Sequence, residues 1–95
     1  MSKLTIVVHI RTNSKKRDFV KKELLKLIDV TRAQKGCLQY DLHQDNYEPN
    51  HFVFYEQWES REHWKNNVNT KHFQDYMLAT ERVIDMIFHE VTQIA

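Results

Sequence analysis

Cysteine, glycine and proline each occur only once in this chain of 95 residues, as Cys37, Gly36 and Pro49. A lone cysteine excludes a disulfide within the chain, so packing alone must hold the fold together. A short chain without disulfides suits a reducing compartment, and we therefore expect a cytoplasmic protein. Internal repeats, linkers and low-complexity stretches are also missing, which predicts a single domain over residues 1–95.

Long apolar runs and an excess of charge of one sign are missing as well. No apolar stretch approaches the roughly 20 residues that span a bilayer. Residues 1–4 lead into a strand pattern without the apolar core of a signal peptide. With 14 basic and 13 acidic residues, the formal net charge is +1. This balance gives no electrostatic reason to expect binding to nucleic acid or to an anionic membrane.

The hydrophobic residues that are present, 41% of the chain, form regular patterns. Apolar and polar residues alternate with a period of two in residues 3–11, 37–43, 51–58 and 86–94, which is typical of β-strands. Residues 44–50 are polar and contain Pro49, so we expect a hairpin loop between the second and third strands.

The segments between these strands have the apolar spacing of helices. Residues 13–14 offer an N-cap, and the following stripe consists of Val20, Leu24, Leu27 and Thr31. Gly36 follows this stripe, where a helix end favours a left-handed residue. A second helical region contains Trp64, Phe73 and Met77 and is broken near Asn69.

The resulting order, β-α-β-β-α-β, predicts an α+β fold of the ferredoxin-like type, with helices on one face of a four-stranded antiparallel sheet. The strand patterns also predict shared faces: Leu38 with Tyr40 and Leu42, and Glu56 with Phe54 and Trp58.

Large side chains occupy both faces of the third and fourth strands. Because the helices cover only one face, we expect a homodimer in which a second copy covers the other. Alternatively, the aromatic residues simply reflect β-propensity at an exposed face.

Three short motifs resemble the antibiotic biosynthesis monooxygenase family. They are residues 36–42 (GCLQYDL), residues 52–60 (FVFYEQWES) and residues 70–73 (TKHF), in the order and at the spacing of that family. The resemblance implies a ferredoxin-like dimer whose two sheets form a barrel-like core, with a pocket between sheet and helices in each subunit. It also implies a quinol monooxygenase, which oxidises a polyphenolic ring with molecular oxygen and without metal, haem or flavin.

Such a reaction requires a dry aromatic pocket, a base and hydrogen-bond donors, because a deprotonated quinol can reduce oxygen directly. We expect the base to be His72 or His9. The start of a helix favours a neutral imidazole at His72, although a solvated or packed histidine is the alternative. The predicted substrate-binding residues are Tyr55, Trp58, Trp64, Asn67, Phe73, Tyr76 and Asn13. Asn13 is also a candidate helix cap, and burial with a hydrogen bond is an equal alternative for His9.

Two departures from the family pattern bear on this assignment. Asn67 stands where many members carry a second histidine, and Met77 stands where haem-degrading members carry an axial histidine. The pattern therefore argues against haem degradation. The six histidines lack the spacing of a metal motif, so we expect no metal, and the resemblance implies that no other cofactor is needed. Glu56 is either a base or, more in keeping with a buried carboxylate, a partner in an ion pair with an arginine such as Arg11 or in a hydrogen bond.

Two other functions compete with the monooxygenase. The first is an isomerase of a small phosphorylated carbonyl compound, for which the chain offers no glycine-rich phosphate loop. The second is a non-catalytic dimer that binds a small hydrophobic ligand. A polar group beside an aromatic pocket favours an enzyme, whereas a sealed apolar cavity favours a binding protein.

Overall fold

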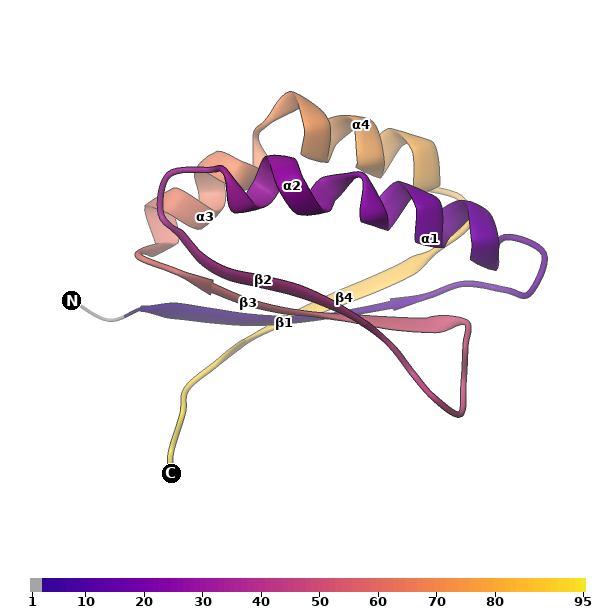
Figure 1. Cartoon of the computed structure of the whole chain (residues 1–95), viewed down its shortest axis with the longest axis horizontal. Coiled ribbons are helices and arrows are strands. Elements are labelled where there is room, and N and C mark those ends of the chain that lie inside the picture. Colours follow the sequence, from indigo (N-terminus) through magenta and orange to yellow (C-terminus); the bar gives the residue numbers. More distant parts are fainter. Residues whose placement is uncertain (1–2) are drawn as a thin grey trace.

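The strands form an antiparallel sheet in the computed structural model, which describes residues 3–95. The elements are, in chain order, β1 (Leu4–Arg11), α1 (Arg17–Leu25), α2 (Leu27–Arg32), β2 (Cys37–Gln44), β3 (His51–Trp58), α3 (Arg61–Val68), α4 (Lys71–Thr80) and β4 (Asp85–Val91). The sheet order is β2-β3-β1-β4, and the helices all lie on one side of it (Figure 1). The predicted ferredoxin-like α+β fold is confirmed.

The register of the central strands sets the two faces of the sheet. Val8 of β1 lies opposite Phe54 of β3 and Phe88 of β4. Because directly paired residues point to the same face, the inner face beneath the helices carries Leu4, Ile6, Val8 and Ile10 of β1, all of them buried.

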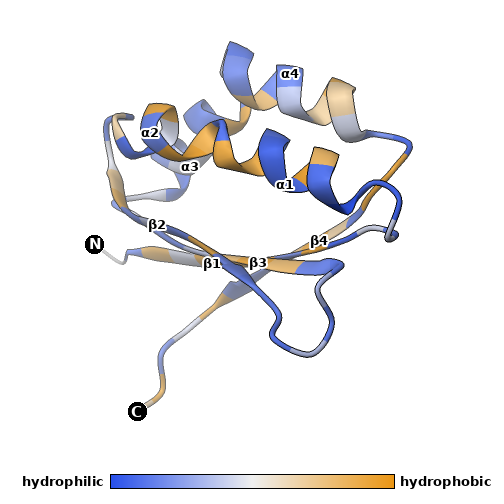
Figure 2. Cartoon of the chain, turned by 45° about the vertical axis from the view of Figure 1, so that its right-hand side comes forward, coloured by the Kyte–Doolittle hydropathy of each residue, from blue (hydrophilic) through white to orange (hydrophobic). Residues whose placement is uncertain are grey.

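In Figure 2, α1 carries both hydrophobic and hydrophilic stretches, as an amphipathic helix over a sheet does. Within the described residues, no helix has the length and apolar character needed to cross a membrane.

The first helical region differs in detail from the prediction. The expected stripe is buried at all four positions, Val20, Leu24, Leu27 and Thr31. However, the expected N-cap at residues 13–14 is wrong, because α1 begins at Arg17 and its N-cap is Lys16. The Asn13 side chain instead accepts a hydrogen bond from the Lys16 backbone N–H at 3.0 Å, in the turn that precedes the helix.

Gly36 has the left-handed conformation expected after the helix, with φ of 85°. A second constraint comes from packing, because a Cβ atom at this position would lie 2.3 Å from Cγ of His63. Both the backbone and the space around it therefore require glycine. The break near Asn69 is also confirmed, since Asn69 is the C-cap of α3 and Thr70 is the N-cap of α4.

The start of β2 departs from strict alternation. An irregularity between Cys37 and Gln39 shifts the register against β3, so that Cys37 pairs with Trp58 and Gln39 with Gln57. The prediction that Leu38 shares a face with Tyr40 is therefore wrong: Leu38 is exposed, and Cys37 packs against the core instead. The last strand is also shorter than predicted and ends at Val91.

Candidate functional site

A cavity of about 340 Å³ lies between the helices and the inner face of the sheet. Its floor comes from β1 and β3, its walls from α3 and α4, and Leu27, Tyr40, Met86 and Phe88 complete it. The rings of Trp64 and Phe88 lie 5.4 Å apart, measured between centroids. Because Phe88 is 53% exposed, this aromatic pair lies where the cavity meets solvent.

The lining is almost entirely apolar. Apart from the indole of Trp64, the only lining side chains with nitrogen or oxygen atoms are Glu56, Asn67, Tyr40 and Tyr76. Burial raises the pKa of Tyr76 to about 12, and it also raises the pKa of Tyr40, so both hydroxyls are neutral at ordinary pH. No lysine, arginine or histidine contributes to the lining. Glu56 is therefore the one lining group that changes charge near neutral pH.

Glu56 lies at the centre of β3, facing the cavity between Phe54 and Trp58. It is only 5% exposed, and its Oε1 accepts a hydrogen bond from Nε1 of Trp58 at 3.0 Å. Burial raises the pKa of this carboxyl from 4.5 to about 7, and the hydrogen bond from Trp58 opposes the rise. Of the two structural alternatives for Glu56, the hydrogen bond is present. The ion pair with Arg11 is wrong, because Arg11 is exposed and no cation within residues 3–95 pairs with Glu56.

Asn67 is the second polar group of the cavity, and His72 lies behind it. Asn67 is 2% exposed, and its Oδ1 lies 3.3 Å from Nε2 of His72. Thr70 donates its hydroxyl hydrogen to the Asn67 carbonyl at 2.6 Å, and its Oγ1 lies 3.1 Å from the same Nε2. Since both neighbours of Nε2 act as acceptors, we assign the hydrogen of neutral His72 to Nε2.

This arrangement fixes the direction of the Asn67 amide. Oδ1 is directed to His72, whereas the NH₂ group of Asn67 makes no hydrogen bond to residues 3–95, and Asn67 is part of the cavity lining. Burial lowers the pKa of His72, so the ring is neutral at ordinary pH. His72 itself does not line the cavity. It contacts Asn67 and Thr70 and holds the amide in place.

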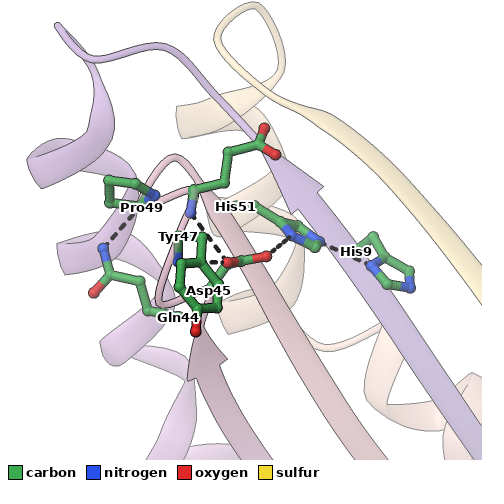
Figure 3. A network of polar contacts seen from close by, with 7 residues as sticks. His9, Gln44, Asp45, Tyr47, Pro49 and His51 are labelled. Carbon is green, nitrogen blue, oxygen red and sulfur yellow. Dashed lines mark hydrogen bonds and ion pairs between the residues drawn. The ribbon is translucent and has the colours of Figure 1, made fainter.

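The other predicted site residues lie elsewhere. His9 is on the outer face of the sheet, where its Nδ1 lies 2.9 Å from Nε2 of His51, and Nδ1 of His51 lies 3.1 Å from Oδ2 of Asp45 (Figure 3). The Asp45 carboxylate is in turn held by the backbone N–H groups of the hairpin loop. This chain of polar groups is separated from the cavity by the sheet.

Tyr55 also lies on the outer face, where its hydroxyl accepts a hydrogen bond from Nε2 of Gln57 at 3.1 Å. Trp58 is fully buried in the core but is not part of the cavity lining. Asn13 lies in a separate, more polar depression with residues that precede β4. The structure therefore brings Trp64, Asn67, Phe73 and Tyr76 together, with His72 one hydrogen bond away, and leaves the other predicted residues outside.

The sequence itself indicates the position of Glu56. The alternation of β3 places it on the inner face, and Trp58, two residues further on the same face, is its nearest donor. Within residues 3–95, no group of three or more histidine, cysteine or acidic side chains is arranged to hold a metal ion. The outer-face groups form a linear chain of contacts rather than a convergent set.

The fold and cavity define a class of proteins: small ferredoxin-like α+β domains that enclose an apolar site between sheet and helices. The sequence profile of the family described as "Antibiotic biosynthesis monooxygenase" matches residues 3–78. A Bacillus subtilis (strain 168) protein named "Putative monooxygenase YcnE" is 31% identical over 74 residues, which cover 78% of each chain. The chain therefore belongs to the antibiotic biosynthesis monooxygenase family.

Solved structures agree with this assignment. The crystal structure of PA3566 from Pseudomonas aeruginosa is 29% identical and superposes with a TM-score of 0.94, over 100% of this chain and 97% of that one. A crystal structure described as an antibiotic biosynthesis monooxygenase is 26% identical, with a TM-score of 0.90 over 97% and 99% of the two chains. These relatives support a monooxygenase function in general terms and do not identify the substrate.

Proposed function

We propose that this protein is a monooxygenase that oxidises a small, neutral, quinol-like aromatic with molecular oxygen and without a metal or organic cofactor. The observation that carries the proposal is the apolar cavity of about 340 Å³ with a carboxyl group and an amide on its wall. This volume lies at the lower end of the range for small-molecule sites, about 300–1,000 Å³, so the substrate is small.

The overall reaction is balanced with oxygen as the only oxidant. One atom of O₂ enters the ring, the other leaves as water, and a quinol becomes a hydroxyquinone. Loss of a proton makes the quinol electron-rich enough to reduce oxygen directly, so the protein supplies proton transfer and charge stabilisation rather than a redox group. The aromatic walls, Trp64, Phe73 and Tyr76 among them, exclude water from the reacting ring.

Asn67 has a defined part in this proposal. Its NH₂ group donates to the oxygen on which negative charge develops, and His72 holds the amide in that orientation as a positioning residue. The cavity lacks the lysine and arginine side chains that a phosphate group requires, and its carboxylate would repel one. For this reason we do not retain the isomerase of phosphorylated compounds as a candidate. A binding protein remains the alternative that an absence of turnover would favour.

We also propose that the protein forms a homodimer through the outer face of the sheet. On this face Ile87, 54% exposed, lies beside His9, and Val91 lies beside Thr5. No helix of the described chain covers them. A second copy would remove this apolar surface from water. Sedimentation at micromolar concentration tests this proposal, and a monomer under those conditions would overturn it.

The oxygenase proposal is tested by oxygen uptake of metal-stripped protein with hydroquinones, naphthoquinols and anthrones. We expect uptake above autoxidation that survives a chelator and decreases about 10²-fold in Asn67→Leu, because one donor to a developing oxyanion contributes about that much. Asn66→Leu, at the exposed neighbouring position, is the matched control. Uptake no faster than autoxidation with the whole panel would refute the proposal.

The positioning role of His72 has its own test. We expect His72→Ala to lower kcat more than it raises KM, because the substrate still fills the cavity while the Asn67 amide loses its orientation. His72→Gln retains an N–H donor and should recover most of the loss. Equal activity of His72→Ala and wild type would show that Asn67 needs no such support.

A further inference from the structure

The carboxyl group of Glu56 has one unusual feature: it is buried in an apolar cavity with a single hydrogen bond. Trp58 donates to Oε1, whereas Oε2 makes no hydrogen bond to residues 3–95. A glutamine would accept the same hydrogen bond from Trp58 without placing a charge in the core. The structural contact with Trp58 therefore does not explain why an ionisable group occupies this position.

The surroundings of Glu56 suit the movement of a proton to and from Oε2. The residues paired with it across the sheet are Ile6 of β1 and Tyr40 of β2. Across the cavity, α3 and α4 present Asn67 and Tyr76. None of these four side chains carries a charge at neutral pH, so no fixed cation holds Glu56 permanently ionised.

We propose that Glu56 is the proton acceptor of this site, and that it takes the hydroxyl proton of the bound quinol through Oε2. The inference rests on the proposed function, since it names the residue that activates the substrate. In this step the substrate O–H bond breaks and its electron pair stays on the substrate oxygen. The proton forms a new O–H bond with Oε2, and the carboxylate becomes a carboxylic acid.

This transfer leaves the total charge of the cavity unchanged. One negative charge is present on Glu56 before the step and on the substrate afterwards, so no new charge is created in an apolar environment. The amide of Asn67 donates to the new oxyanion. The substrate anion then forms a bond from a ring carbon to O₂, and the protonated Glu56 returns its proton to the outer peroxide oxygen, which gives a ring hydroperoxide. The O–O bond breaks next: the outer oxygen takes the hydrogen of the same carbon as a proton and leaves as water, and that carbon becomes a carbonyl.

The pKa of Glu56 differs from the pKa values of the titratable groups near it. The pKa of Glu56 is about 7, close to the working pH that an effective base requires. Burial raises the pKa values of Tyr40, Tyr76 and Cys37, which therefore titrate well above neutrality. The pKa of His72 is lowered below 6.5 by burial. A rise in rate around pH 7 that is lost in Glu56→Gln therefore reports Glu56.

The test that does not depend on turnover uses 2-naphthol and naphthalene as probes of the cavity. Between pH 5.5 and 8 the naphthol hydroxyl stays protonated, while Glu56 becomes an ionised acceptor. We expect the ratio of naphthol to naphthalene affinity to rise about fivefold in wild type, because hydrogen bonds to charged acceptors are stronger. In Glu56→Gln the ratio should stay constant. A wild-type ratio that does not change with pH would overturn the inference.

The kinetic test uses the quinol substrate for which oxygen uptake is fastest. We expect Glu56→Gln to lose about 10²-fold or more in kcat/KM and to lose the rise near pH 7. A variant that keeps both the rate and the rise would overturn the assignment of Glu56. If no quinol is oxidised at all, the proposed function fails, and the naphthol ratio still decides whether Glu56 is the acceptor of the site.

Discussion

Glu56→Gln is expected to change the stability of the protein in a way that depends on pH. The Glu56 carboxyl titrates near 4.5 when unfolded and near 7 when folded, because burial disfavours its charged form. Between these values the folded state binds more protons than the unfolded state, so the free energy of unfolding falls as pH rises. The stabilising contribution is complete below pH 4.5 and is lost as pH rises through 7.

The size of this effect follows from the two pKa values. A difference of about 2.5 pKa units, at about 1.36 kcal/mol per unit, gives about 3 kcal/mol. Glutamine has no proton to lose, and its amide oxygen can accept the hydrogen bond of Trp58. The variant should therefore gain up to about 3 kcal/mol relative to wild type between pH 4.5 and pH 8.

Urea unfolding at intervals over this pH range measures the difference directly. Other groups also titrate in this window, and the lowered pKa values of His9 and His72 act in the opposite direction. Subtracting wild type from Glu56→Gln at each pH cancels these shared contributions. Glu59→Gln, an exposed carboxyl three residues away, is the control and should show no such rise. A flat difference for Glu56→Gln would refute a raised pKa at this site.

Three further predictions concern the groups around the site. Trp58→Phe removes the only donor to the Glu56 carboxylate among residues 3–95 and should raise the pKa of Glu56 above 7, as measured by carboxyl ¹³C shifts in an NMR titration; an unchanged value would contradict the role of this bond. Gly36→Ala should destabilise the fold by about 1–2 kcal/mol in urea unfolding, because φ is 85° and His63 must move. Thr70→Ala should cost about 1 kcal/mol through loss of the α4 cap, whereas the exposed Thr92→Ala should be neutral.

The sequence predicts the fold well because the relevant signals are local. Strict alternation in β1, the helical stripe of α1 and α2, and the single glycine at residue 36 each specify a conformation within a few residues. These local signals do not predict the register shift between Cys37 and Gln39 in β2, because the shift depends on how β2 pairs with the neighbouring strand β3. Leu38 therefore turns outward although its sequence position predicts the opposite.

The candidate site is harder to predict because it depends on which face of the sheet the helices cover. Alternation separates His9 from the apolar face, but it does not say that the polar side of β1 is remote from the cavity. Similarly, a histidine in the first turn of α4 has no sequence signal for its direction, and His72 turns to Asn67 rather than to the cavity. The alternation of β3 correctly predicts that Glu56 faces the helices. The same alternation predicts Trp58 in the cavity wall, but in the structure Trp58 lies outside the lining and donates a hydrogen bond to Glu56.

The position of Glu56 links stability to function. In a protein of this size the net stability is about 5–15 kcal/mol, so about 3 kcal/mol lost on ionisation is a substantial share. An uncharged residue of the same shape would avoid this loss and keep the hydrogen bond to Trp58. The stability lost on ionisation is therefore explained if the ionised carboxylate of Glu56, whose Oε2 makes no hydrogen bond to residues 3–95, takes part in the function of the protein. A proton acceptor for a neutral aromatic substrate is such a use, because the bound substrate replaces water as the partner of the charge.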